Sequence, residues 1–160
     1  MGMARRIVGV AVVTVAVAFF GSAHAQSTSL TTKEEYQKFY TDYLTAEGYR
    51  PEVDSDGDVS FKREGLTYYI IVTETDAEFF EMALPNIHSI VDESDRTKAY
   101  IAADYSNAKS KVSKVYMVND DVWVTVELFI ASPEDFKSVF QRSLAALLNG
   151  ATNFITKMGE

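Results

Sequence analysis

Three aspartates in a turn-rich stretch, Asp54, Asp56 and Asp58, are the residues of this sequence that most suggest a metal site. Clustered carboxylate oxygens are the ligands that calcium prefers. However, a helix-loop-helix calcium loop beginning at Asp54 needs glycine at its sixth position and glutamate at its twelfth, where Val59 and Gly65 stand. We therefore interpret this stretch as a solvated hairpin turn and predict no metal site.

Histidine and cysteine offer little for catalysis. The chain has no cysteine, and its two histidines are His24 and His88. A zinc site needs several nitrogen or sulfur ligands, and a nucleophile elbow needs a Gly-x-Ser-x-Gly motif, which the sequence lacks. We interpret His88 as an ordinary loop or packing residue, and we predict no catalytic residue and no cofactor.

Carboxylates are the remaining candidates for catalysis, because two of them can support hydrolysis if they converge in space. Many of the acids fall in predicted turns and helix caps, where a structural role accounts for them. These acids are Glu34, Glu35, Asp76, Asp120, Asp121, Glu134 and Asp135. We predict that the chain is not an enzyme, and a carboxylate-dependent enzyme is the alternative.

The N-terminal segment is typical of a signal peptide. Arg5 and Arg6 precede the apolar run 7–20, and Ala23-His24-Ala25 follows as a cleavage motif. The run has about 14 residues, fewer than the roughly 20 that a membrane-spanning helix needs. We predict a signal peptide over 1–25 cleaved after Ala25, a flexible tether over 26–31 and a single domain over 32–160. The expected location is periplasmic or secreted, without membrane insertion after cleavage; an uncleaved anchor is the alternative.

The net charge restricts the class of partner. The chain has 15 basic and 23 acidic residues, a net charge of −8, and cleavage would also remove Arg5 and Arg6. An acidic domain repels the phosphates of nucleic acids and anionic lipid surfaces. We expect an unknown protein partner, or a second copy of the chain, and no nucleic acid.

The spacing of apolar residues predicts three helices and five strands. The helices are expected over 33–47, from Asp92 or Ser94 to Asn107, and from Pro133 to Ile155, and the strands over 59–62, 66–73, 79–84 (ending at Pro85), 112–118 and 122–130. The turns between neighbouring strands are too short for crossover helices, so the strands should be antiparallel. One face of the last of these strands should be core, and its residues are Val122, Val124, Val126, Leu128 and Ile130. The predicted fold is α+β: a five-stranded antiparallel sheet with three helices on one face, in the order α-β-β-β-α-β-β-α.

Four stretches of the chain resemble a known family. They are Glu47-Gly48-Tyr49, Asp56-Gly57-Asp58-Val59-Ser60-Phe61, Ala102-Ala103-Asp104-Tyr105-Ser106-Asn107 and Lys114-Val115-Tyr116. In these stretches the chain is similar to the YbjN-like proteins, described as bacterial sensory transduction regulators, whose fold is that of the type III secretion chaperones. The resemblance covers residues 32–155 and implies a non-enzymatic protein-binding role, with dimerisation as an option.

Aromatic residues on the strands suggest a binding surface. Trp123 and Phe129 lie on the strand face opposite the valine row, and Tyr69 and Ile71 share one face of their strand. If these four residues lie on one open sheet face, they form the kind of aromatic patch that marks interfaces. We therefore predict a periplasmic protein-binding module, chaperone-like or a regulatory adaptor, monomeric or homodimeric.

Two alternatives stay open for the aromatic residues. A helix or the tether could cover them, since strand register is not fixed by the sequence. The chain could also bind a small apolar ligand in a pocket between helix and sheet, lined by tyrosines and phenylalanines.

Overall fold

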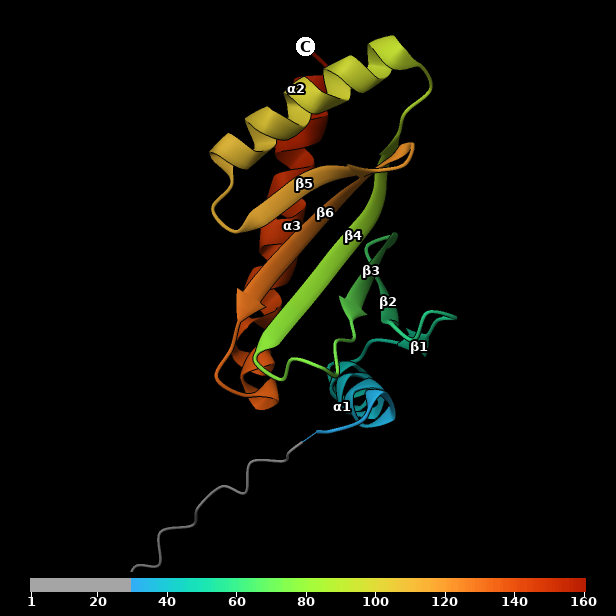
Figure 1. Ribbon diagram of the computed structural model, residues 1–160, viewed down its shortest axis with the longest axis vertical. Coiled ribbons are helices and arrows are strands. Elements are labelled where there is room, and N and C mark those ends of the chain that lie inside the picture. Colours follow the sequence, from blue (N-terminus) through green and yellow to red (C-terminus); the bar gives the residue numbers. More distant parts are fainter. Residues whose placement is uncertain (1–29) are drawn as a thin grey trace, which may run out of the picture.

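The computed structural model describes residues 30–160, so the predicted signal peptide and most of the tether lie outside the described residues. The described part is a six-stranded antiparallel sheet with three α-helices (Figure 1). The elements are α1 (Lys33–Ala46), β1 (Glu52–Val53), β2 (Val59–Arg63), β3 (Leu66–Ile71), β4 (Phe79–Ser89), α2 (Glu93–Lys109), β5 (Ser113–Val118), β6 (Asp121–Phe129), a 3-10 turn (Pro133–Asp135) and α3 (Phe136–Met158).

The α+β fold and the element order are as predicted, with one additional strand. The strands lie in the order β1-β2-β3-β4-β6-β5, and every neighbouring pair is antiparallel. The additional strand, β1, is only two residues long, and it pairs with Val59 and Ser60 of β2. Two residues are too few to produce an alternating pattern, so the sequence predicted five strands where the sheet has six.

The prediction that the third strand stops at Pro85 is wrong. β4 continues to Ser89 through a bulge: Leu84 faces Val124 and His88 faces Val122, so residues 85–87 stand opposite a single residue of β6. Proline has no N–H to donate to a ladder, and a bulge is one of the few places where a strand accommodates it. Asn86 takes the positive φ of 56° that this local turn requires.

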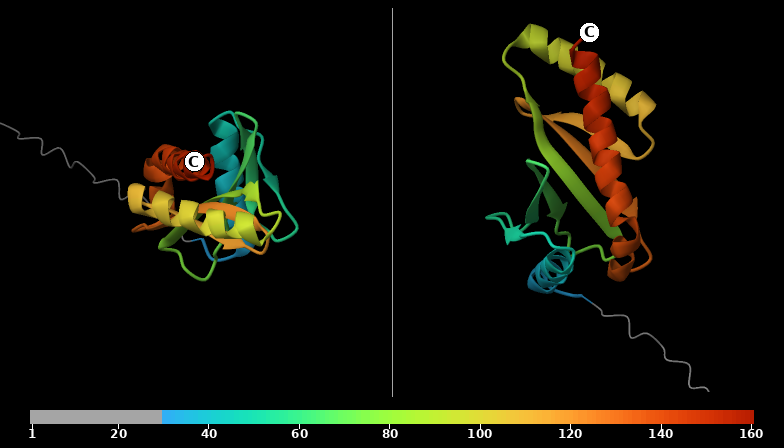
Figure 2. Two further views of the ribbon diagram at one scale, coloured as in Figure 1. Left: turned by 90° about the horizontal axis from the view of Figure 1, so that it is seen from above. Right: turned by 180° about the vertical axis from the view of Figure 1, so that it is seen from behind.

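The core lies between the sheet and the two helices α1 and α3. Val122, Val124 and Val126 are fully buried, as predicted from the valine row. α3 runs diagonally across the core side of the strands β4, β6 and β5, and it lies in front of them in the view from behind (Figure 2, right). α1 covers the end of the sheet that holds β2. Aromatic rings from α1 and α3 meet in this core. The ring centroids of Tyr40 and Phe136 are 5.0 Å apart, and the two ring planes are nearly perpendicular.

α2 differs from the other two helices, because it packs across α3 and along β5 (Figure 1). The Ser106 hydroxyl donates to the carbonyl of Gly150 in α3 over 2.8 Å. The Asn107 amide bonds both backbone groups of Val115: its Nδ2 donates to the carbonyl and its Oδ1 accepts from the N–H. The helix continues past Asn107 to Lys109, in contrast to the predicted end, and the Asn107 side chain occupies the outer edge of β5.

Candidate functional site

The four residues predicted to form a binding surface lie on the same face of the sheet. Tyr69 pairs with Ala83, which pairs with Thr125, so these residues form one row across β3, β4 and β6. Because side chains alternate along a strand, Ile71 shares the face of Tyr69, and Trp123 and Phe129 share that of Thr125. α1 and α3 pack on the opposite side, against the valine row. We call the side that carries the four residues the outer sheet face.

The aromatic residues of the outer sheet face differ in exposure. Phe129 is 85% exposed, whereas Tyr69, Ile71 and Trp123 are half-buried. Ala83 and Thr125 lie between the larger side chains and are fully buried, although they face away from the core. The half-buried rings are therefore already held by their neighbours, and Phe129 projects furthest into solvent.

Two aromatic residues of this face were missed by the sequence analysis. Tyr116 of β5 stands opposite Trp123, and Phe79 of β4 stands opposite Phe129, with ring centroids 6.0 Å apart. The alternation of Tyr116 with Val115 and Met117 was a usable signal. The pairing of Phe79 depended on register, which the sequence did not fix.

A charged strip divides the outer sheet face between these aromatic pairs. Glu81 stands opposite Glu127, which forms an ion pair with Lys114 and accepts from the Thr125 hydroxyl over 3.1 Å. Burial raises the pKa of Glu81, and the neighbouring Glu127 carboxylate raises it further. The hydrogen bond from Lys114 to Glu127 raises the pKa of the lysine. The strip therefore has two carboxylates, on Glu81 and Glu127, and one lysine, Lys114, to neutralise them.

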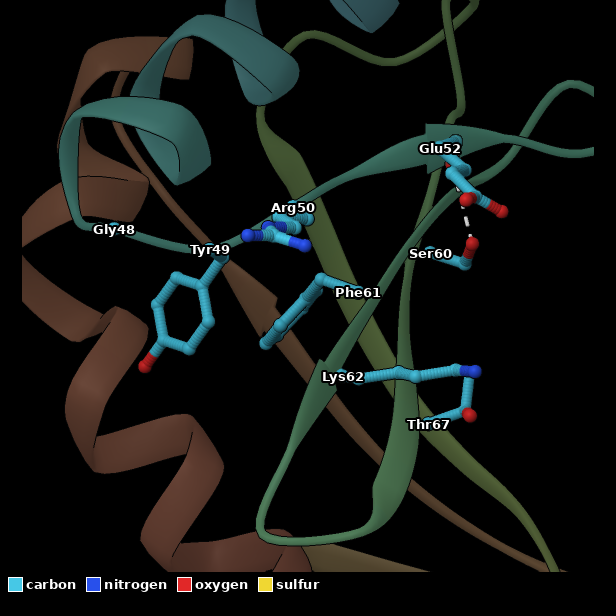
Figure 3. A pocket seen from close by; sticks show the side chains of 8 residues that line it. All are labelled: Gly48, Tyr49, Arg50, Glu52, Ser60, Phe61, Lys62 and Thr67. Carbon is cyan, nitrogen blue, oxygen red and sulfur yellow. Dashed lines mark hydrogen bonds between the residues drawn. The ribbon is translucent and has the colours of Figure 1, made fainter.

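A recess of about 450 Å³ lies between the segment after α1 and the β2–β3 hairpin (Figure 3). Figure 3 shows Tyr49, Arg50 and Phe61 grouped at one end and Lys62 beside Thr67 at the other. Phe61 is buried, and its ring centroid is 4.9 Å from that of Tyr49. Among residues 30–160, no strand pairs with this side of β2 beyond Ser60, so its backbone edge runs open along the recess.

A second hollow of about 580 Å³ lies between α3 and the ends of β5 and β6. Its lining is formed by Lys109, Lys111, Val112, Ser113, Leu128, Val139, Arg142, Ser143, Ala145, Ala146 and Asn149. No aromatic ring lines it, in contrast to the pocket that the sequence suggested between helix and sheet. The rings pack on one another between α1, α3 and the sheet, as Tyr43, Phe136 and Phe140 do, and so fill the space that such a pocket would need.

The aspartates of the 54–58 turn are used to shape that turn. One oxygen of Asp54 accepts from the N–H groups of Asp56 and Asp58, each over 2.9 Å. Asp58 accepts from the N–H of Val72 over 2.8 Å. Burial raises the pKa of Asp58. In the described range 30–160, no three of the potential ligands are grouped as a metal site would require.

His88 was interpreted as a loop or packing residue; it lies within β4 and not in a loop, and its contacts give it a packing role. Its Nε2 is 2.9 Å from the Asp95 carboxylate in the first turn of α2. The Val91 N–H donates to the same carboxylate, and this hydrogen bond, followed by that of His88, lowers the pKa of Asp95. The pair joins the end of the sheet to the start of α2, which is a packing role.

Comparison with known proteins agrees with this architecture. Residues 34–153 match the family described as T3SS (YopN, CesT) and YbjN peptide-binding chaperone 1. The chain belongs to this family. Its members are peptide-binding chaperones and not enzymes, which confirms the non-enzymatic prediction.

Among solved structures, the chain is similar to the crystal structure of YbjN from E. coli. The TM-score is 0.55 at 12% sequence identity, over 74% of this chain and 88% of that chain. At this identity the likeness shows a shared fold. No curated protein sequence matches the chain. From residue 30 to the C-terminus, no helix combines the length and hydrophobicity needed to cross a membrane.

Proposed function

We propose that this protein is a periplasmic, chaperone-like module that binds an extended peptide segment of a partner protein on its outer sheet face. The observation that carries the proposal is the placement of Tyr69, Ile71, Trp123 and Phe129 on one face, opposite the core. Membership of a peptide-binding family supports the class of ligand.

The aromatic residues of the outer sheet face are held by their neighbours before a partner binds. Tyr69 and Trp123 are half-buried among their neighbours, so ordering them on binding costs little side-chain entropy. Phe129 would bury the most new surface against a partner. Full burial of such a side chain contributes about 1.5–3 kcal/mol of favourable free energy. Tyrosine and tryptophan are the residues that most often dominate interface energies.

The periplasmic location is supported by the segment ending in Ala23-His24-Ala25, with its preceding apolar run. The measurement is the intact mass of the protein recovered from periplasmic and cytoplasmic fractions of a Gram-negative host. Export predicts a chain that begins at Gln26 in the periplasm. A full-length chain found only in the cytoplasm would remove this part of the proposal.

The binding surface is tested by affinity capture from an envelope fraction with the wild-type protein and the double variant Tyr69→Ala/Trp123→Ala. Tyr100→Ala is a matched control, because Tyr100 is an exposed tyrosine on α2. We expect the double variant to lose the captured partner and the control to retain it. Light scattering on the same samples shows whether the partner is a second copy. Equal capture and equal mass for all three proteins would refute the surface.

A further inference from the structure

The hollow between α3 and the β5 and β6 ends has properties that the outer sheet face lacks. We call it the α3 groove. Its apolar wall is formed by Val112, Leu128, Val139 and Ala146. α3 covers the core side of the sheet (Figure 2). The α3 groove and the outer sheet face are therefore separate surfaces.

Three cations surround the α3 groove in an otherwise acidic protein. Lys109 ends α2, Lys111 lies in the loop that follows, and Arg142 lies on α3. Lys109 has a structural role, because it complements the C-terminal dipole of α2 and lies over the Tyr105 ring. Within residues 30–160 none of the three cations forms an ion pair, and residues 1–29 contain no Asp or Glu. In the same range 30–160, Lys111 and Arg142 also lack the ring contact that holds Lys109.

Two buried hydroxyls line the same groove without a hydrogen-bond partner. Ser143 of α3 is 2% exposed and Ser113 of β5 is 8% exposed, and the Oγ of each is unsatisfied. Buried polar side chains nearly always have partners, because an unpaired one loses its bonds to water and gains nothing. This observation is independent of the three cations and indicates a ligand that can accept hydrogen bonds within the groove.

We propose that the α3 groove binds an acidic peptide segment, as a second site with a different chemistry from that of the outer sheet face. An apolar side chain of the peptide packs on Val112, Leu128 and Val139. A peptide oxygen accepts from the Ser143 hydroxyl, whereas the Ser113 hydroxyl lies against Gly150 of α3. Asp or Glu side chains of the peptide pair with Lys111 and Arg142.

The shape of the groove favours a peptide over a small ligand. Lys111, Val112, Arg142 and Asn149 are all exposed, so the groove is open along its length. A small molecule in such a groove would keep much of its surface in water, whereas small-ligand pockets enclose most of theirs. An extended chain can enter and leave through the open sides.

The test compares two labelled peptides by fluorescence anisotropy with the purified protein. One is fluorescein-Asp-Glu-Val-Glu-Asp-amide, and its neutral twin is fluorescein-Asn-Gln-Val-Gln-Asn-amide. We expect the acidic peptide to bind about tenfold more tightly at low salt, and the preference to shrink at high salt because ion pairs are screened. Equal affinities for the two peptides would overturn the proposal.

Variants locate the site. Lys111→Gln/Arg142→Gln should reduce binding of the acidic peptide to the level of its neutral twin, whereas Lys98→Gln, which removes an exposed charge elsewhere on α2, should not. Ser143→Ala should weaken binding and yet raise the melting temperature, because it removes a buried unsatisfied hydroxyl. Unchanged binding in either groove variant would overturn the proposal.

Two controls distinguish the α3 groove from a different binding site. Trp123→Ala should leave binding of the acidic peptide intact. The test of the α3 groove is therefore independent of whether the outer sheet face binds a partner. Loss of binding in that variant would place the peptide on the sheet and contradict the groove. Free glutarate should compete only weakly; displacement of the peptide by glutarate at similar concentration would identify a small-anion site instead.

Discussion

Glu81 and Glu127 stand directly opposite each other on neighbouring strands, in the middle of the outer sheet face. Like charges at facing positions of a sheet destabilise it. Lys114 pairs with Glu127, and the raised pKa of Glu81 reflects its burial and the second carboxylate. The fold therefore carries an unfavourable charge at neutral pH on the surface that we propose for binding.

Replacing Glu81 with glutamine should stabilise the protein at pH 7. Facing like charges cost a few tenths to about 1 kcal/mol, and we expect a gain of that order in the free energy of unfolding. The pKa of Glu81 is raised in the folded state, so its charged form destabilises the fold. This destabilisation appears as the pH rises above the ordinary value of 4.5 and is absent below it.

Urea unfolding checks this at pH 7 and near pH 4, where Glu81→Gln and wild type should converge. The exposed Glu78, just before β4, provides a control in Glu78→Gln, which should change little at either pH. If Glu81→Gln lowered the free energy of unfolding at pH 7, the proposed repulsion between Glu81 and Glu127 would be contradicted.

Asn107→Ala should destabilise the fold, because it leaves the N–H and C=O of Val115 without their partners. A hydrogen bond contributes about 0.5–1.5 kcal/mol net, so the loss of two predicts a decrease of roughly 1–3 kcal/mol in the free energy of unfolding. The comparison is Asn149→Ala, since Asn149 bonds only side chains at the surface and should cost less than about 0.5 kcal/mol. Equal effects for the two asparagines would show that the edge contact is unimportant.

Gly150→Ala should also destabilise the protein, although alanine is the better helix former by about 1 kcal/mol. A Cβ at this position would lie 2.7 Å from the Ser113 Oγ and 3.0 Å from a Val124 methyl. Overpacking of a buried contact costs about 1–3 kcal/mol, which exceeds the gain in propensity. Thermal unfolding should show a lower melting temperature than wild type, with partial recovery when Ser113→Ala is added. Gly159→Ala, where the nearest atom is 3.5 Å away, should show no such loss.

Asp95→Asn should make the stability of the protein less dependent on acid pH. The pKa of Asp95 is lowered by the Val91 N–H and then by His88, so its charged form stabilises the fold. That stabilisation is present above the unfolded value of 3.8 and is lost as the pH falls through the lower folded value. The variant should be less stable than wild type at pH 6. The difference in the free energy of unfolding should become smaller at acid pH. A gap that stays constant between pH 6 and pH 2.5 would exclude this account.

Much of the fold was predictable because local chemistry and global packing agree. α1 begins at Lys33, where the helix was predicted, and a capping box of Thr32 and Glu35 holds this end. The alternation around Val124 placed Trp123 and Phe129 on the opposite face. β1 and the extension of β4 beyond Pro85 were missed, since a two-residue strand has no period and a bulge breaks the period. Both depend on contacts with a neighbouring strand.

The α3 groove was not predictable from the sequence for a different reason. Lys111, Ser113 and Arg142 come from separate segments, and only the path of α3 over the sheet brings them together. Ser143 lies among the apolar residues of the helix, where a small polar residue gives a weak signal. Its unsatisfied hydroxyl becomes visible only when its surroundings are known.

The contact of Asn107 with Val115 has a consequence for how copies of this protein can associate. The middle of β5 already has its outward backbone groups bonded, whereas β2 beyond Ser60 does not. A new strand can therefore extend the described sheet on one side only. Two molecules that join through β2 would use up both available edges, so the assembly would close as a pair instead of growing into a fibre.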